Sequence, residues 1–344
     1  MKKTLILVSI SVALAIICSN AARTLGAESQ SIELNYAVFV PPMHVMNIEA
    51  QAWGREVEKR TASKVKINVH PGSTLLKPST VYQGVIAGSA DIAVLPCSYN
   101  RALWPISMAL NYCNLRFPSA NVGTHVINDL YKKYKEAKEF SEMKMLYFFT
   151  CDTGAVASNK PIRTVEDARG IEVKATGPEF IKLLGASLVG MPMSEVAVGL
   201  QKGTIDAAVI SYDVLKGMRL ADVVKYVSPN LQMGTTAFWV GMNIDKWNSL
   251  APDIKRTIEK INTERIGIVG RAWDKAGEEG VKYAKSLGVE FISWPPEEDA
   301  KLQKLFLPIR EDYIKELNSK GLPGREIIET VLELADKRSK EFSE

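Results

Sequence analysis

The segment from Gly170 to Phe180, GIEVKATGPEF, combines two features that hold anions in proteins. Apolar and polar residues alternate up to Thr176, which predicts a short strand with Lys174 at its end. Thr176-Gly-Pro-Glu179 then fits the capping-box pattern of a helix start, where unpaired N–H groups and the positive helix end attract anions. A carboxylate bound here would meet the Lys174 ammonium, the helix dipole and amide donors together. An exposed lysine in front of an ordinary capped helix is the alternative.

Motifs for catalysis, nucleotide binding and metal binding are absent from the sequence. GxGxxG after a strand, GxxxxGK[ST], HExxH and GxSxG do not occur, and the three histidines lack ligand spacing. Three cysteines outside the first 27 residues form no CxxC and allow at most one disulfide: Cys97, Cys113 and Cys151. We therefore expect no catalytic residue, no cofactor and no metal, and the sequence favours binding over turnover. An exported enzyme on a two-lobe scaffold is the alternative.

Residues 1–27 predict a secretory signal peptide. Lys2 and Lys3 precede an almost unbroken apolar run from Leu5 to Cys18, and small residues follow as far as Ala27. The run has about 14 residues, whereas roughly 20 are needed to span a bilayer, so a membrane anchor is disfavoured. We expect cleavage and export to the periplasm.

The charge of the exported chain is close to zero. Formal charge falls from +4 to about +1 when Lys2, Lys3 and Arg23 leave with the signal peptide. A nearly neutral protein has no general attraction to nucleic acid or anionic lipid, so neither is an expected partner. The 344 residues are 46% hydrophobic, which is enough material for two packed lobes.

The chain is organised as two similar α/β halves. Strand, helix and strand patterns cover 31–40, 45–61 and 64–70, and they lead to GSADIAV at 88–94. The second half passes through strand and helix patterns to GTIDAAV at 203–209. Both heptapeptides read G-x-x-D-x-A-V after a helix, which indicates two lobes built on the same plan.

Later segments predict the connections between these lobes. An apolar strand within 143–159 is expected to run between them, and 235–243 is a candidate return crossing. Helical periodicity over 252–288 predicts a helix of roughly 50 Å that braces both lobes, with Gly267, Gly270 and Gly277 as candidate bend points. Amphipathic helices are expected around 297–319 and 323–341.

The sequence resembles the DctP-like solute-binding proteins of tripartite ATP-independent periplasmic (TRAP) transporters. The resemblance covers nearly all of the mature chain and rests, in order, on AWGREVEKRTASKVKINVHPGSTL, GVIAGSADIAV, SNKPIRTVEDARGIEVKATG, VGMPMSEVAVGLQKGTIDAAV, LADVVKYVSP and MNIDKWNSLAPD. It implies a type II-like periplasmic binding protein fold, in which two Rossmann-like α/β lobes are joined by crossing hinge strands and a long bracing helix. It also implies hinge closure over a ligand and delivery to an ion-gradient-driven membrane permease.

We combine the resemblance with the sequence patterns to divide the chain. Lobe I is expected to comprise 28–151 with about 240–275, and lobe II 152–239 with about 276–344. The ligand cleft would lie between them, and a monomer is the expected state. An exported sensor, or a binding protein of another transporter class, is the alternative within the binding proteins.

The family pattern is altered at its basic positions. In these proteins the strand after the SNKPI-type block usually carries an arginine that grips the ligand carboxylate, and Lys174 stands in that place. Some members carry a second arginine just before this block, where the present sequence reads GAVASN. A lysine ammonium is a compact charge and cannot bind a carboxylate in the bidentate geometry of a guanidinium. We therefore expect a small organic acid, a monocarboxylate with an apolar or aromatic body, and not a dicarboxylate or sugar acid.

Other ligand contacts are expected in loops at strand ends, where α/β folds bind their ligands. Each candidate has a structural alternative, such as a turn cap for Asp152 or core packing for the tyrosines and the tryptophan. The residues expected beside Lys174 and Thr176 are Phe39, His44, Tyr99, Asp152, Ser211, Tyr212 and Trp239.

Overall fold

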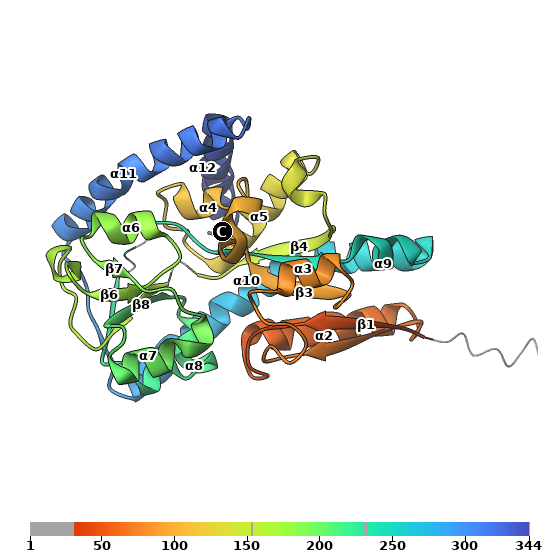
Figure 1. The fold of residues 1–344 in the computed structure, drawn as a ribbon, viewed down its shortest axis with the longest axis horizontal. Helices are drawn as coiled ribbons and strands as arrows, with labels where there is room; N and C mark the ends of the chain where they lie inside the picture. Colours follow the sequence, from red (N-terminus) through yellow and green to blue (C-terminus); the bar gives the residue numbers. More distant parts are fainter. Residues whose placement is uncertain (1–30, 153, 230, 232, 344) are drawn as a thin grey trace, which may run out of the picture.

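Two β-sheets, one in each lobe, organise the protein (Figure 1). The computed structural model describes residues 31–343 except 153, 230 and 232, so the predicted signal peptide lies outside the described residues. Lobe I holds five strands in the order β2-β1-β3-β10-β4. They are β1 (Ile32–Ala37), β2 (Val65–His70), β3 (Ile92–Pro96), β4 (Lys144–Thr150) and β10 (Ala237–Met242). β1 pairs in parallel with β2 and β3, and β10 runs antiparallel to β3 and β4.

Lobe II holds six strands in the order β11-β9-β5-β8-β6-β7. They are β5 (Ala155–Ser158), β6 (Glu172–Lys174), β7 (Ser187–Leu188), β8 (Ala207–Ile210), β9 (Tyr226–Pro229) and β11 (Glu290–Phe291). β6 pairs in parallel with β7 and β8, whereas β5 is antiparallel to β8 and β9. Parallel pairs flanked by one reversed strand appear in both lobes, which confirms the predicted two-lobe α/β fold.

The two matched heptapeptides begin at equivalent glycines. α3 (Val81–Ile86) and α7 (Val196–Lys202) end just before Gly88 and Gly203. These glycines have φ values of +76° and +72°, in the left-handed region that glycine enters at little cost. Each glycine therefore ends a helix and turns the chain into the following strand, β3 or β8.

The matched aspartates make equivalent contacts as well. Asp91 Oδ2 accepts a hydrogen bond from Asn35 N of β1 at 2.7 Å. Asp206 Oδ2 accepts one from Glu172 N of β6 at 3.1 Å. Each carboxylate thus ties the start of one strand to its parallel neighbour, which explains why both heptapeptides contain an aspartate at this position.

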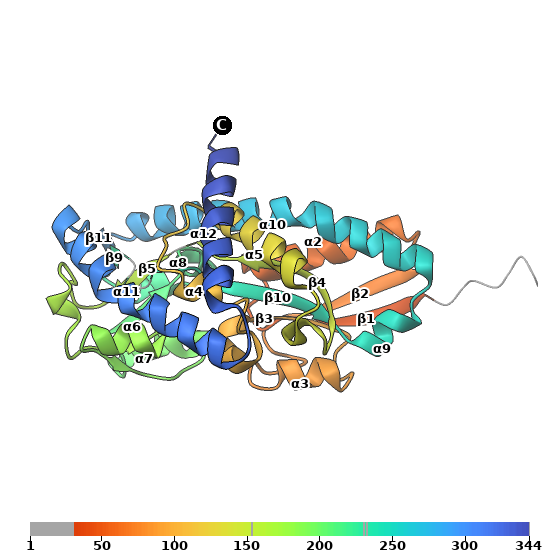
Figure 2. The same ribbon diagram turned by 90° about the horizontal axis from the view of Figure 1, so that it is seen from above.

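The lobes are joined by two short segments and one long helix. Residues 151–154 lead from β4 to β5, so the apolar segment predicted as a single crossing strand is divided into two strands. The chain returns from β9 to β10 through 230–236. α10 (Pro252–Ser286) runs for 35 residues along both lobes (Figure 2), as its periodicity predicted.

Glycines in α10 allow close packing against the hinge. A Cβ on Gly277 would lie 2.6 Å from Asp152 Oδ2, and a Cβ on Gly280 would overlap the carbonyl oxygen of Tyr212. A larger residue at Gly280 would have to move the backbone, whereas one at Gly277 would displace the Asp152 side chain. These glycines therefore bring the helix onto the hinge, while α10 remains one helix through all of them.

The remaining helices cover the sheets. They are α2 (Val45–Arg60), α4 (Ala109–Tyr112), α5 (Ala120–Tyr134), α6 (Pro178–Leu183), α8 (Asp213–Gly217), α9 (Ile244–Ser249), α11 (Pro296–Ser319) and α12 (Gly324–Glu341). Short 3-10 turns are η1 (Cys97–Leu103), η2 (Lys138–Phe140), η3 (Glu166–Ala168), η4 (Met193–Glu195) and η5 (Leu220–Asp222). No helix in the described part of the chain is long and apolar enough to cross a bilayer.

The last two helices, both predicted, divide between the lobes. α11 contacts α6 of lobe II and α4, whereas α12 packs against α5, which covers β4 of lobe I. The apolar face of α12, including Ile327 and Val331, is buried there. The surface that α12 covers was not predictable, because an apolar helix face does not specify its partner.

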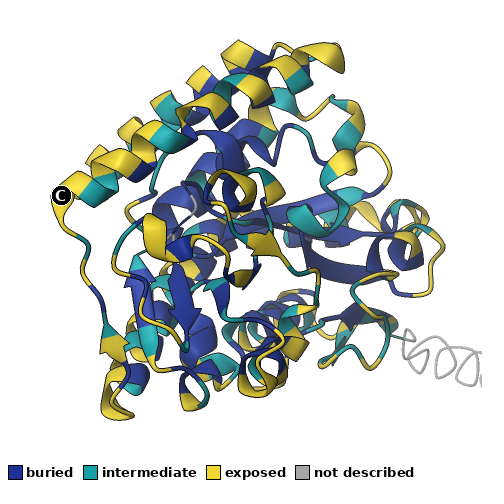
Figure 3. Ribbon diagram, turned by 60° about the vertical axis from the view of Figure 1, so that its left-hand side comes forward, coloured by how far each residue is buried: buried dark blue, intermediate teal, exposed yellow. Residues whose placement is uncertain are grey.

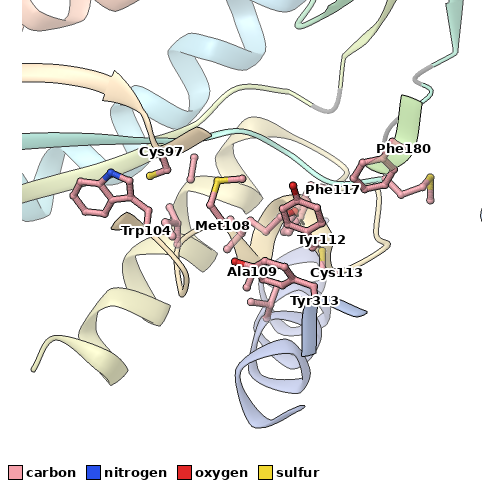
Figure 4. Close-up of a cluster of buried hydrophobic side chains, with 14 of the residues drawn as sticks. Cys97, Trp104, Met108, Ala109, Tyr112, Cys113, Phe117, Phe180 and Tyr313 are labelled. Atoms are coloured by element: carbon pink, nitrogen blue, oxygen red, sulfur yellow. Dashed lines mark hydrogen bonds between the residues drawn. The ribbon is translucent and has the colours of Figure 1, made fainter. Parts of the chain in front are cut away.

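Buried aromatic rings connect the two lobes. Tyr112 of α4 stacks on Tyr313 of α11 with ring centroids 4.4 Å apart, and on Phe180 of α6 at 5.8 Å (Figure 4). Burial is continuous through both sheets and the helices above them (Figure 3). The three cysteines in the described residues are buried and unbridged.

Candidate functional site

A cavity opens between the lobes at the ends of several strands. The space inside it that can admit water-sized molecules is about 100 Å³, which leaves room for a small ligand. Both lobes contribute walls, because the loops after β1, β3 and β4 face those after β6 and β8. The main wall residues are Phe39, Val40, His44, Ser98, Tyr99, Cys151, Asp152, Lys174, Thr176, Met193, Ser211, Asp213, Val214, Thr235, Thr236, Phe238 and Trp273.

Lys174 is the last residue of β6 and supplies a buried positive charge. Its side chain lines the cavity, yet the residue is only 8% exposed. Burial lowers the pKa of the ammonium from 10.5 to about 8, and the nearby Cys151 thiol opposes this shift. Neither a hydrogen bond nor an ion pair joins Lys174 to another described residue. A buried cation without a counter-charge is costly, and an anion entering the cavity would relieve that cost.

The helix after Lys174 begins later than the sequence predicted. α6 starts at Pro178, its N-cap is Gly177, and no side chain caps it. Glu179 does not reach back to Thr176, because its carboxylate pairs with Arg101 from lobe I. A charge-assisted bond to a guanidinium outweighs a bond to a neutral amide, so the capping-box prediction is wrong. Thr176 lines the cavity, whereas the first turn of α6 is not part of its wall.

His44 and Asp213 face each other inside the same cavity. His44 is the N-cap of α2, and its Nδ1 accepts a hydrogen bond from Met46 N at 3.2 Å. The proton of a neutral His44 therefore lies on Nε2, which is 2.9 Å from Asp213 Oδ2. Both side chains are 2% exposed. This contact joins lobe I to lobe II across the cavity.

Asp152 is a second buried carboxyl group beside this pair. Both of its oxygens lie 3.2 Å from Tyr212 N and accept its hydrogen, at the start of α8. Burial, and next the charge of Asp213, raise the pKa of Asp152 to about 8. Asp152 thus holds the start of α8 and lines the cavity at the same time. The described residues contain no group of three or more His, Cys, Asp or Glu side chains that could hold a metal ion.

Contacts across the cleft place the lobes in a closed arrangement. His44 meets Asp213, and a Cβ on Gly217 of α8 would lie 3.2 Å from His44 Cδ2. At the outer rim, Arg101 of lobe I pairs with Glu179 of α6 and Glu316 of α11. The cavity is therefore enclosed by side chains from both lobes.

Most of the residues predicted from the sequence meet in this cavity, and two do not. Seven line it: Phe39, His44, Tyr99, Asp152, Lys174, Thr176 and Ser211. Tyr212 lines a neighbouring hollow beside α10. Trp239 is fully buried and stacks on Trp104 in the core of lobe I, with ring centroids 5.7 Å apart. Successive side chains of a strand point to opposite faces, so Phe238 lines the cavity and Trp239 does not.

Several wall residues were not singled out from the sequence. Asp213 directly follows the predicted Ser211 and Tyr212, so extending that strand-end loop by one residue would have included it. No sequence motif marked four other wall residues, because loops distant in sequence meet here only after folding. These residues are Cys151, Met193, Thr235 and Thr236.

Comparisons with known proteins agree with this architecture. The family model of bacterial extracellular solute-binding proteins, family 7 (DctP), matches residues 36–316. A curated relative from Albidiferax ferrireducens, described as a solute-binding protein, is 27% identical over 202 residues, and the match spans about half of either protein, 54% of each.

Two solved structures are similar over nearly the whole fold. A TRAP periplasmic solute-binding protein from Desulfovibrio salexigens, an open complex, is 31% identical with a TM-score of 0.78, covering 89% of this chain and 96% of that one. A TRAP solute-binding protein from Rhodoferax ferrireducens, in complex with copurified benzoate, is 20% identical with a TM-score of 0.83, covering 90% and 99%. The chain therefore belongs to the DctP family of bacterial extracellular solute-binding proteins, the substrate-binding proteins of TRAP transporters.

Proposed function

We propose that this protein captures a small monocarboxylic acid with an apolar or aromatic body in the cavity between its lobes. The observation that carries the proposal is the buried Lys174 ammonium, which lines the cavity and has no counter-charge among the described residues. A ligand carboxylate would supply that charge, with the Thr176 hydroxyl beside it.

The other charges of the cavity favour a single carboxylate on the ligand. Among the described residues of its wall, Lys174 is the one lysine or arginine. Asp213 lines the same space, so a second ligand carboxylate would meet its negative charge, and Asp152, whose pKa is raised to about 8, supplies no positive charge to offset it. A dicarboxylate is therefore poorly matched to this site.

The walls between the charged groups suit an apolar ligand body. Phe39, Tyr99, Phe238 and Trp273 present aromatic surface, and Met193 and Val214 add aliphatic surface. A polyhydroxy acid would leave many of its hydroxyl groups without partners against such walls. Similarity to the benzoate-bound protein supports the fold alone at 20% identity, so the ligand class rests on the cavity residues.

We further propose how capture leads to transport. The protein would be exported to the periplasm by its first 27 residues, act as a monomer, close about its hinge, and deliver the acid to the membrane permease of a TRAP system. In the division we propose, lobe I comprises 28–151 and about 240–275, and lobe II comprises 152–239 and about 276–344; α12, in the second of these ranges, reaches across to contact α5 of lobe I.

Mass spectrometry of ligand released from protein purified without refolding tests the proposal. We expect a monocarboxylic acid with an apolar or aromatic body. Calorimetric titration with benzoate, phenylacetate, succinate and gluconate then checks the class, and binding should be confined to the first two. Tight binding of only the dicarboxylate or the polyhydroxy acid would contradict the proposal.

A further inference from the structure

We propose that His44 and Asp213 form a hydroxyl-recognising subsite, which narrows the ligand to a hydroxy-substituted monocarboxylic acid. This inference rests on the proposed function, because it assumes that the carboxylate of the same molecule is held at Lys174. The subsite consists of the His44 Nε2–H group of lobe I and the Asp213 carboxylate of lobe II, 2.9 Å apart.

Asp213 is a buried acceptor whose hydrogen-bonding capacity is unused. The residue is 3% exposed, and neither carboxylate oxygen has a well-aligned hydrogen-bond donor among the described residues. The His44 ring nitrogen is near enough for an ion pair, but its N–H direction does not give a hydrogen bond to Asp213. Buried acceptors in native proteins are nearly always satisfied, so Asp213 requires a donor that the described residues do not supply.

His44 is a donor in the same position. Its Nδ1 is occupied by the Met46 N–H group, which leaves Nε2–H directed to the neighbourhood of Asp213. The pair therefore offers one donor and one acceptor, each without an aligned partner, side by side in the cavity wall.

A hydroxyl group is the substituent that satisfies both. Its oxygen accepts from His44 Nε2–H while its hydrogen is donated to Asp213. An ammonium only donates and would place a cation against the His44 donor. A carboxylate only accepts and would face the Asp213 charge, and a methyl group satisfies neither residue.

The subsite is separate from the carboxylate-binding end. No ion pair joins Lys174 to Asp213 or Asp152. Lys174, Cys151 and Asp213 all line the same cavity. One ligand molecule would therefore place its carboxylate at Lys174 and its hydroxyl at His44 and Asp213.

Closure of the lobes completes the subsite. His44 and Asp213 lie on different lobes, so they separate when the cleft opens. A hydroxyl that has entered the open cleft then meets both residues, lying beside the pair, as the lobes close.

Calorimetric titration with matched acids tests the inference. The pairs are benzoate with 3- and 4-hydroxybenzoate, phenylacetate with 3-hydroxyphenylacetate and mandelate, and butyrate with 3-hydroxybutyrate. In at least one pair we expect the wild-type protein to bind the hydroxy acid about 10- to 100-fold more tightly than its parent, as for a hydrogen bond to a charged group.

Variants then assign the preference to Asp213. Asp213→Leu should lose the hydroxyl preference, so that hydroxy and parent acids bind it with equal affinity, and Asp213→Asn should reduce the preference. If Asp213→Leu fails to fold by circular dichroism, Asp213→Asn decides. Lys216→Ala is the control, since Lys216 lies on the same helix but pairs with Glu279 at the surface.

The outcomes separate this inference from the proposed function. Equal binding of hydroxy and parent acids by wild type, or a preference for 3-aminobenzoate over both, would overturn the hydroxyl subsite while Lys174→Met still abolished acid binding. A preference that survives Asp213→Leu would also overturn it. If no acid bound, or if Lys174→Met left acid binding unchanged, the proposed function would fall as well.

Discussion

Replacing Lys174 by Met is expected to weaken ligand binding and to stabilise the empty protein at the same time. The substitution keeps an unbranched side chain, one atom shorter, and removes its buried charge. Burial lowers the pKa of Lys174 from 10.5 to about 8. Each pKa unit corresponds to about 1.4 kcal/mol, so keeping this ammonium protonated costs the folded protein about 3 kcal/mol at pH 7. Lys174→Met removes that cost.

The sign of the effect sets its pH dependence. The pKa of Lys174 is lower in the folded state than in the unfolded state, so between pH 8 and 10.5 the unfolded chain binds more protons. The free energy of unfolding of the wild type therefore gains from this group as pH rises through that window, and below pH 8 the full penalty remains. The variant lacks this contribution, so its advantage should shrink as pH approaches 10.5.

Ligand binding should change in the opposite direction. Removing one partner of a buried charge pair costs about 2–5 kcal/mol, which corresponds to a roughly 30-fold to several-thousand-fold loss of affinity. The expected gain in stability raises the Tm of the ligand-free protein by roughly 4 °C for a chain of about 310 folded residues.

Differential scanning calorimetry and isothermal titration with the released acid measure the two effects. Lys66→Met is the matched control, because Lys66 lies on β2, is half exposed and pairs only loosely with Glu33 at 3.5 Å. It should alter neither quantity appreciably. A Lys174→Met protein that bound the acid as tightly as wild type, or that lost stability at pH 7, would refute the reasoning.

Three further predictions follow from the hinge, the rim and the charge at Lys174. Affinity for the acid should fall about tenfold per pH unit above pH 8, since binding requires the protonated lysine; a flat titration profile from pH 7 to 10 would contradict this. Arg101→Gln removes the rim contacts to Glu179 and Glu316, so about 1 kcal/mol of closed-state stability should be lost, with a roughly fivefold weaker affinity and a larger radius of gyration in small-angle scattering; an unchanged radius and affinity would argue against a role in closure. Gly280→Ala should destabilise the protein by more than about 3 kcal/mol in denaturant unfolding, because its Cβ meets the Tyr212 carbonyl. Gly267→Ala, on the same helix and near only movable side chains, should stay within about 1 kcal/mol of wild type, and equal effects of the two would contradict the close-packing argument.

The parts of the fold that were predictable from sequence depend on local patterns. The two G-x-x-D-x-A-V segments indicate two similar lobes. Their glycines, Gly88 and Gly203, adopt a left-handed backbone conformation. Their aspartates, Asp91 and Asp206, each accept a hydrogen bond from a neighbouring strand. The position of Lys174 at a strand end was also readable, but alternation placed it on the same face as the exposed Glu172, so its burial was not predictable.

The errors came from interactions that no local pattern contains. The capping-box prediction was wrong because the Glu179 carboxylate binds Arg101, which is 78 residues away in sequence. Phe238 and Trp239 could not be told apart, since β10 is buried on both faces and its apolar run hides which side chain faces the cavity. The role of Asp213 could not be predicted, because it depends on a contact with His44 of the other lobe.

Because Lys174 has no counter-charge among the described residues, it bears on how a membrane permease could recognise loaded protein. An empty protein with closed lobes bears the whole desolvation cost of this ammonium. A solute that carries its own negative charge cancels that cost. Loaded molecules should therefore hold the closed shape more firmly than empty ones, so a permease that binds the closed shape would select loaded molecules without contacting the solute.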